Sequence, residues 1–314
     1  MHKLASIFLL LIAPFLIFFI LIIQYSIILA FTLPLIVSFI TYFSFLANHY
    51  SSFSIPLLIF SPRSLIAHQI NRFVSRPFNF LFTQHLIIKY IQKRANSHAT
   101  SNSTYLSLQD FHKRPIANQR HFVQIDGILV RAESQINSIY CPVDCSQAFF
   151  GDFSASEMVK AEVGLQNTFE TVTGCANTKN SKYGYCYFQL SSANSQQVVA
   201  PFNFVFSRVL EIVKGWFPLN KNTIGKLPRI VCDNSRFVVH GDWKGRNAFV
   251  VFVQGVRGVQ FTESDFYAAG QEIGCFCQGV YVIYEMNVCE RWQIVKGGCV
   301  QAGDEVVQIV NTCQ

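Results

Sequence analysis

The chain has 314 residues, of which 51% are hydrophobic and only 14% are charged, and its formal net charge is +7. Average proteins are about 25% charged, and the deficit lies at the N-terminal end, where Lys3 is the only Asp, Glu, Lys or Arg before Arg63. Because water cannot solvate so long an apolar stretch, these numbers exclude a chain that is soluble over its whole length. The length leaves room for about two domains.

Two apolar runs within residues 1–47 predict a helical hairpin that spans a membrane. Ala5–Ile23 and Ser26–Leu46 are each close to the ~20 residues that a spanning helix needs. Gln24 and Tyr25 separate them and are the expected turn. A cleaved signal peptide is the alternative for the first run, but this run is longer than a signal-peptide core and no clear cleavage site follows it. We therefore favour an uncleaved helix.

Residues 48–110 form a basic juxtamembrane region. The segment Pro77–Gln92 places basic side chains on one helical stripe and apolar ones opposite, which predicts either an amphipathic helix in the membrane interface or a short third span. Basic clusters beside membrane helices attract anionic lipid head groups, so we favour lipid over nucleic acid as the ligand. The predicted head-group contacts are Arg63, Arg72, Arg76, Lys89, Lys93 and Arg94.

The polar stretch Ala95–Thr104 is predicted to be a linker, because it lacks apolar periodicity. It contains Asn102-Ser103-Thr104, the acceptor pattern for N-glycosylation. Asn102 is therefore a candidate glycosylation site if the following domain lies in a lumen or outside the cell. The positive-inside rule does not determine on which side of the membrane the domain lies, because Lys3 before the first helix and Arg63 after the second contribute nearly equally.

Residues 111–314 are predicted to form one α+β domain with a mainly antiparallel sheet. Runs of β-branched and aromatic residues indicate a strand or hairpin arm at His121–Arg131 and a series of strands from Arg229 onward. The continuous apolar run Phe249–Val253 indicates a strand buried on both faces. Capping residues and apolar residues at helical spacing indicate helices at Ser154–Thr171 and Phe202–Trp216.

All ten cysteines lie inside this domain. An even number of cysteines in a loop-rich domain favours disulfides and an oxidising compartment, so we place the domain on the lumenal or extracellular side. Thiols in a cytosolic domain and a zinc site are the alternatives. Only Cys141 and Cys145 have the spacing of zinc ligands, and we therefore expect no metal. The candidate disulfide cysteines are Cys141, Cys145, Cys175, Cys186, Cys232, Cys275, Cys277, Cys289, Cys299 and Cys313.

The sequence contains no motif that we identify as catalytic. His240 is a candidate catalytic base, but the chain has no Gly-x-Ser-x-Gly turn. Gly225-Lys226 lacks the upstream glycine of a phosphate-binding loop. We therefore expect no catalytic residue and no cofactor.

The leading hypothesis for function is a membrane-anchored surface or envelope-type protein, whose disulfide-stabilised ectodomain serves in binding or assembly. A viral structural glycoprotein is an example of this layout. The expected partners are a bilayer with anionic head groups and other proteins or a second copy. The first alternative is a membrane-remodelling or replication-organelle protein with a cytosolic domain, and the second is a membrane-tethered hydrolase that uses a cysteine or His240.

The predicted side of the membrane can be tested at Asn102. If the linker lies in the lumen, a glycosidase will increase the gel mobility of the full-length chain, and Asn102→Gln will run like the treated wild type because it lacks the acceptor amide. Asn96→Gln is the matched control, since Asn96 lies in the same linker but outside an acceptor pattern. A shift that persists in Asn102→Gln, or no shift in the wild type, contradicts the prediction.

Overall fold

The computed structural model describes the chain from Tyr105 to Thr312, with gaps at 106, 115–120, 127, 133–134, 154–158, 161–165, 178–180, 191–193, 216, 218, 220–229 and 256–258. The chain divides into two units, 1–61 and 62–314, and the described residues all belong to the second. The predicted helical hairpin, the basic lipid contacts, the linker and Asn102 lie outside the described residues. Within the described ranges no helix is long and apolar enough to cross a membrane.

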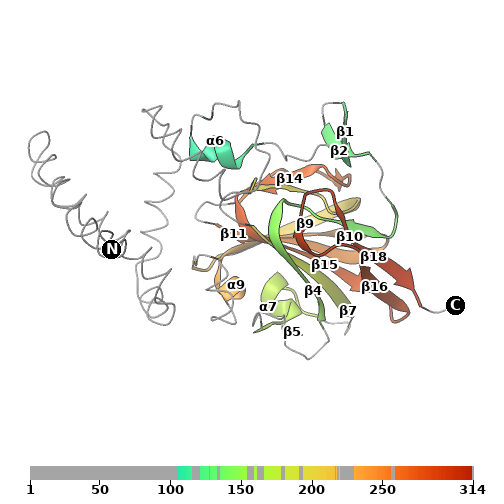
Figure 1. Ribbon diagram of the computed structural model, residues 1–314. Coiled ribbons are helices and arrows are strands. Elements are labelled where there is room, and N and C mark those ends of the chain that lie inside the picture. The colour runs from blue at the N-terminus through green and yellow to red at the C-terminus, as the bar shows by residue number, and fades with distance from the viewer. Residues whose placement is uncertain are drawn as a thin grey trace, which may run out of the picture. The chain divides into compact units, whose positions relative to one another are not determined.

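The described elements are short helices and a larger set of strands (Figure 1). The helices are α6 (Leu108–His112), α7 (Phe169–Thr173) and α9 (Ile230–Asp233). The strands are β1 (Phe122–Ile125), β2 (Ile128–Arg131), β3 (Ser138–Tyr140), β4 (Cys145–Phe153), β5 (Val159–Lys160), β6 (Gln166–Asn167), β7 (Lys182–Gln189), β8 (Gln197–Val199), β9 (Phe204–Ile212), β10 (Arg236–Trp243), β11 (Arg246–Gln254), β12 (Gln260–Phe261), β13 (Phe266–Tyr267), β14 (Glu272–Cys275), β15 (Cys277–Met286), β16 (Glu290–Ile294), β17 (Gly298–Val300) and β18 (Glu305–Asn311).

The domain is built on an eight-stranded sheet with the strand order β13-β9-β10-β11-β15-β7-β4-β17. Neighbouring strands pair antiparallel throughout. At its centre, β11 pairs with β10 on one side and β15 on the other, and every residue from Phe249 to Val253 is buried. This confirms the prediction made from the continuous apolar run. A strand buried on both faces requires a covering layer on each side of the sheet.

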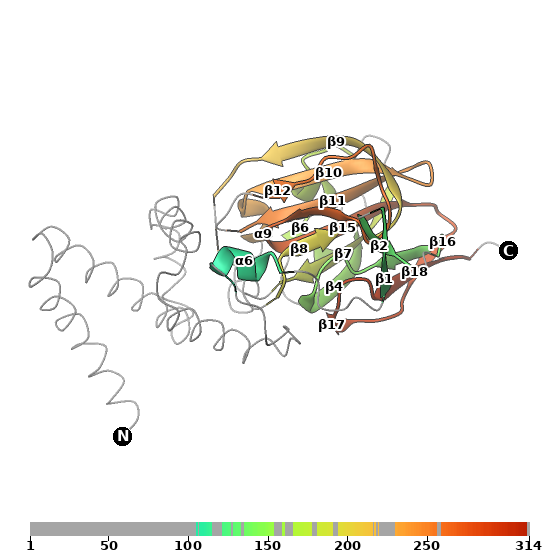
Figure 2. The ribbon, with the colours of Figure 1, turned by 90° about the horizontal axis from the view of Figure 1, so that it is seen from above.

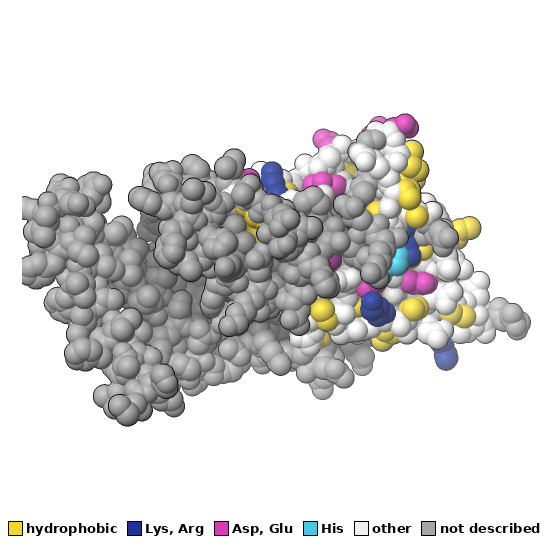
Figure 3. Space-filling model, turned by 45° about the horizontal axis from the view of Figure 1, so that its top comes forward, with side chains coloured by type: hydrophobic (Ala, Val, Ile, Leu, Met, Phe, Trp, Pro, Cys, Tyr) yellow, Lys and Arg dark blue, Asp and Glu magenta, His cyan; other side chains and the backbone are white. Residues whose placement is uncertain are grey.

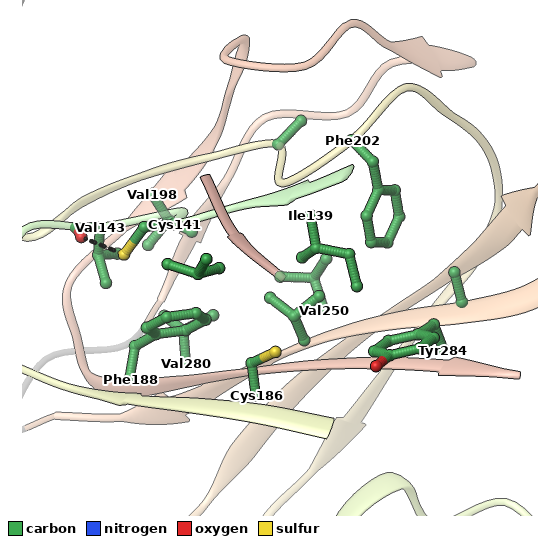
Figure 4. Packing of buried hydrophobic residues seen from close by; sticks show 14 of the residues in the cluster. Ile139, Cys141, Val143, Cys186, Phe188, Val198, Phe202, Val250, Val280 and Tyr284 are labelled. Carbon is green, nitrogen blue, oxygen red and sulfur yellow. Dashed lines mark hydrogen bonds between the residues drawn. The ribbon is translucent and has the colours of Figure 1, made fainter. Parts of the chain in front are cut away.

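One face of this sheet is covered by two three-stranded sheets, β12-β14-β8 and β16-β18-β3. The hydrophobic core lies between the layers, with Val250, Val280 and Tyr284 from the large sheet and Ile139 and Val198 from the small ones. Figure 4 shows these side chains meeting in the space between the strands. Their removal from water is the main favourable term in folding this domain.

The opposite face is covered by α7 and α9, with aromatic side chains beneath. Phe169 of α7 stacks on Tyr183 of β7 with ring centroids 4.1 Å apart, and it meets Phe249 of β11 edge-on at 5.4 Å. Arg236 of β10 donates a hydrogen bond of 3.0 Å to the carbonyl of Val172. This bond ties the C-terminal end of α7 to the sheet, and α7 and α9 appear below the sheet in Figure 1.

The mainly antiparallel sheet confirms the predicted class of the C-terminal domain, but the helix predicted at Phe202–Trp216 is wrong. Residues Phe204–Ile212 form β9, which pairs with β10 from Val205 to Ile212. The helical spacing of its apolar residues is a local signal, whereas the strand is stabilised by main-chain bonds to a partner more than twenty residues away. Such tertiary pairing overrides local preference.

Two further predictions of secondary structure are wrong, one of a helix and one of a strand. Of the helix predicted at Ser154–Thr171, the described part is helical only from Phe169 onward, where α7 begins after the cap at Thr168, while Val159–Lys160 and Gln166–Asn167 are the strands β5 and β6. The strand predicted at Arg229–Cys232 is the helix α9. The first prediction extended a helix from a capping pattern alone, and the second came from a short apolar run that fits either a helix or a strand.

Gly241 is a position where the fold requires the absence of a side chain. It lies in β10 at a register shift against β9, and a Cβ there would lie far inside contact distance of the Val205 carbonyl oxygen. We expect Gly241→Ala to lower the free energy of unfolding by about 1–3 kcal/mol, as overpacking of a core does. Gly255→Ala is the matched control, because its Cβ would meet no atom closer than 3.5 Å. Equal denaturation midpoints for the two variants would contradict this description of the strand.

Candidate functional site

Three loops meet at one end of the large sheet. They are the turn Cys141–Cys145 between β3 and β4, the segment Ser195–Gln197 that leads into β8, and the junction Cys275–Gly279 between β14 and β15. The Val199 amide donates to the Pro142 carbonyl at 2.8 Å, and the Phe276 amide donates to the Gln196 carbonyl at 3.1 Å. We call this convergence the loop site.

Phe276 gives the junction an unusual backbone. Its φ of 71° lies in the left-handed region that non-glycine residues rarely adopt, and its side chain is buried. The hydrogen bond from its amide to Gln196 and the contact of the Lys113 ammonium with its ring, at 5.3 Å, hold this conformation. Backbone strain of this kind concentrates at functional sites, so the conformation of Phe276 makes the loop site a candidate functional site.

Helix α6 and the loop before β18 close the loop site. The Gln196 amide donates to the His112 carbonyl at 2.9 Å, and the Ser195 hydroxyl donates to the Arg114 carbonyl at 2.8 Å. From the other side, the Ala302 amide donates to Oδ1 of Asp144 at 3.0 Å. The site is therefore assembled from five parts of the chain that are distant in sequence.

The loop site carries charges of both signs. Arg114 is 6% exposed, and its guanidinium lies 4.1 Å from the centre of the Phe111 ring. Burial lowers the pKa of Arg114, and the electrostatic attraction of Tyr105 and Asp144 opposes this shift. A cation and a carboxylate in a partly desolvated site are suited to bind a zwitterionic ligand, because charge-assisted hydrogen bonds are stronger than neutral ones.

Three thiols lie next to these charges. Cys141 and Cys145 are buried and their side chains are hydrogen bonded, and the thiol of Cys141 also contacts the Val143 carbonyl at 3.0 Å (Figure 4). The thiol of Cys299 donates to the Cys145 carbonyl at 3.3 Å. Burial raises the pKa of Cys141 well above its ordinary value, and the bond to Cys145 raises it further. Cys141 is therefore held as a protonated thiol and not as a nucleophilic thiolate.

The candidate disulfide cysteines are distributed over the whole domain. Eight are thiols in the structure: Cys141, Cys145, Cys175, Cys186, Cys232, Cys275, Cys277 and Cys299. Cys289 is disulfide-bonded, and Cys313 lies outside the described residues. The pairing of the other eight stays a prediction. In the described part of the chain, no group of three or more His, Cys, Asp or Glu side chains is arranged to hold a metal ion.

His240 lies away from the loop site, in the middle of β10. Its ring stacks on Phe249 with centroids 4.5 Å apart, and Nε2 is 2.9 Å from Oδ1 of Asn247. Burial lowers the pKa of His240, so the ring is neutral at neutral pH. Its hydrogen-bond partner is an amide and not a hydroxyl or thiol, and this geometry assigns His240 a packing role in the sheet.

A scan against protein-family models matches residues 108–308 to the phosphatidylserine decarboxylase family. The chain belongs to this family. The matched range runs from α6 into β18 and includes every residue of the loop site. None of the curated protein sequences matches the chain.

Membership of the phosphatidylserine decarboxylase family corrects the functional hypothesis drawn from the sequence. The interpretation as a surface or envelope-type protein, with a viral envelope glycoprotein as its example, is wrong, because the domain it treated as an ectodomain matches an enzyme family. The number of cysteines in a domain indicates the redox state of its compartment, but it does not indicate whether the domain catalyses a reaction. The expected contact with phospholipid is consistent with a family that is named for a phospholipid.

Sequence reasoning missed Arg114, Asp144 and Phe276. Asp144 lies inside Cys141-Pro-Val-Asp-Cys145, which we interpreted only through its cysteines. Phe276 lies between Cys275 and Cys277, and the sequence around it does not predict its positive φ. The one available signal was the density of glycine and cysteine in Glu272–Gly279, which is unusual for the interior of a sheet.

The thiol environments predict an order of alkylation. In the folded chain without reductant, we expect iodoacetamide to modify the exposed Cys299 first and to leave Cys141, Cys186 and Cys277 unmodified, because burial both shields these thiols and raises their pKa. The three should react after denaturation. Peptide mass spectrometry measures each site. If Cys141 reacts as fast as Cys299, its burial is wrong, and if it stays unmodified after denaturation, it forms a disulfide.

Proposed function

We propose that this protein acts on phosphatidylserine at a membrane surface and that the loop site binds the serine head group. The observation that carries the proposal is the family match across residues 108–308, which contains Arg114 and Asp144 together with the loops around them. The apolar and basic segments predicted before residue 105 support it, since they would keep the domain beside its lipid.

The chemistry of the head group fits the charges of the loop site. A phosphoserine head group carries an anionic phosphate, an anionic carboxylate and a primary ammonium group. The guanidinium of Arg114 suits either anion, and the carboxylate of Asp144 suits the ammonium, whose hydrogens a choline head group lacks. The pair therefore supplies a physical basis for selecting serine over choline.

Decarboxylation of the bound lipid is a second candidate function, favoured by the family match. Loss of CO₂ from the serine head group would leave an electron pair on its α-carbon, and a carbonyl cofactor would supply the electron sink for that pair. A lysine-bound cofactor would need a desolvated lysine at the site, and Lys113, whose ammonium lies 5.3 Å from the centre of the Phe276 ring there, is exposed to solvent. The lysines whose side chains are described are all exposed to solvent, and these are Lys113, Lys182, Lys214, Lys244 and Lys296.

A pyruvoyl group made from a serine of the chain is the other source of such a carbonyl. The serines described beside the loop site are Ser195 and Ser146, and their hydroxyls donate to the carbonyls of Arg114 and Gln189. The described residues therefore do not fit either carbonyl group, and we derive no step through one. Mass spectrometry of phosphatidylserine vesicles incubated with the full chain decides whether phosphatidylethanolamine forms.

We also propose that the C-terminal domain lies in an oxidising compartment. The disulfide at Cys289 supports this placement, because disulfides rarely persist in the cytosol. The confinement of all ten cysteines to this domain supports it too.

Binding of the head group can be measured with a soluble fragment of the lipid. We expect glycerophosphoserine to raise the melting temperature of the full-length chain in detergent and glycerophosphocholine to raise it less. Asp144→Asn should weaken glycerophosphoserine binding by about tenfold, since it removes one charge-assisted hydrogen bond. Asp152→Asn is the matched control, because Asp152 is an exposed carboxylate paired with Lys182 at 3.4 Å. Equal stabilisation by the two ligands would contradict the proposal.

A further inference from the structure

The hairpin of β1 and β2 has one face made only of β-branched aliphatic side chains. The strands pair with Val123 opposite Val130 and Ile125 opposite Ile128. Because side chains alternate along a strand, these four lie on one face of the hairpin. Asp126, with a φ of 50°, forms the turn between the strands, as the Asp-Gly sequence favours.

This aliphatic face is exposed to solvent. Val123, Ile125 and Ile128 are 40%, 55% and 47% exposed, and Val130 is half-buried. Hydrophobic side chains form a yellow group along this edge of the domain in Figure 3. Among the described strands β1 and β2 pair with each other, and the amide of Arg131 in β2 also donates to the Ala269 carbonyl at 2.7 Å, so the rest of the domain holds the hairpin in place. A contiguous apolar face of this kind marks a surface that meets another apolar phase.

The hairpin is attached to the loop site through its other face. Phe122 packs against Val199 and Ala302, whose amides bond the Pro142 carbonyl and the Asp144 carboxylate. Figure 1 shows the hairpin and α6 both above the large sheet, with α6 near its left end and the hairpin farther to the right, and Figure 2 shows the same separation from above. Helix α6 is the first described element after the segments predicted to be in lipid.

We infer that the aliphatic face of the β1–β2 hairpin inserts into the surface of a phospholipid bilayer and so turns the loop site toward the head groups. The inference rests on the proposed function, since it supplies the orientation that a site for membrane lipid requires. Val123, Ile125 and Ile128 enter the edge of the hydrocarbon, while Asp126 at the tip stays in the head-group layer.

A bilayer fits this face better than a second copy of the chain does. Four aliphatic side chains bury a few hundred Å² at most, whereas a stable protein interface buries roughly 1,200 Å² or more. A bilayer needs no such area, because each inserted aliphatic side chain gains transfer free energy by itself.

Photocrosslinking in vesicles tests this inference on the full-length chain. p-Benzoylphenylalanine replaces Ile125 in one variant and Ile128 in a second, and the chains are placed in phosphatidylcholine vesicles with and without phosphatidylserine. The matched control replaces Val288, an apolar residue that is 99% exposed in the turn after β15. We expect lipid adducts at Ile125 and Ile128 several-fold above those at Val288, in both kinds of vesicle, because insertion depends on hydrocarbon.

Each other outcome overturns the inference. Adduct yields at Ile125 and Ile128 that equal the yield at Val288 place the hairpin in water, and a covalent dimer of the chain identifies a second copy as the occupant. The result is separate from that for the proposed function. Lipid adducts without selectivity for glycerophosphoserine would support the inserted hairpin and contradict the head-group site. Selectivity for glycerophosphoserine without lipid adducts would support the head-group site and contradict the inserted hairpin.

Discussion

The pairing of β11 with β15 at the centre of the large sheet is the constraint on which the rest of the domain depends. Both strands are buried along most of their length, so each face of the sheet must be covered, by two small sheets on one side and short helices on the other. β15 also starts at the loop site, directly after the strained Phe276. The strand that organises the core therefore determines where the junction Cys275–Gly279 lies.

The loop site combines a rigid frame with charges of both signs. Backbone hydrogen bonds join its three loops. The carbonyl of Arg114 accepts a hydrogen bond from Ser195, and the carboxylate of Asp144 accepts one from the amide of Ala302. Such a frame orders the charged groups before a ligand arrives, which lowers the entropic cost of binding. The hairpin β1–β2 packs on the same frame through Phe122, and we infer that its aliphatic face contacts the membrane around the head group.

The sequence predicted those elements whose signal is local. The run Phe249–Val253 indicated a doubly buried strand, and His121–Arg131 indicated a strand or hairpin arm where the structure has the whole hairpin β1–β2, because in each case the pattern lies within a few residues. β9 was mispredicted as a helix because its partner β10 is distant in sequence. The loop site was missed for the same reason, since Arg114, Asp144 and Phe276 become neighbours only through long-range pairing. The cysteines indicated a compartment, and the envelope-protein hypothesis drawn from them was wrong.

Hydrogen–deuterium exchange of the full-length chain in vesicles tests the central claim most directly, because it reports on the loop site and its lipid together. The account predicts that amides in Cys141–Cys145 and in Ser195–Val199 exchange more slowly when phosphatidylserine replaces part of the phosphatidylcholine, while the buried amides of β11 stay unchanged. Identical exchange of these loops in the two kinds of vesicle would contradict a head-group site at this end of the sheet.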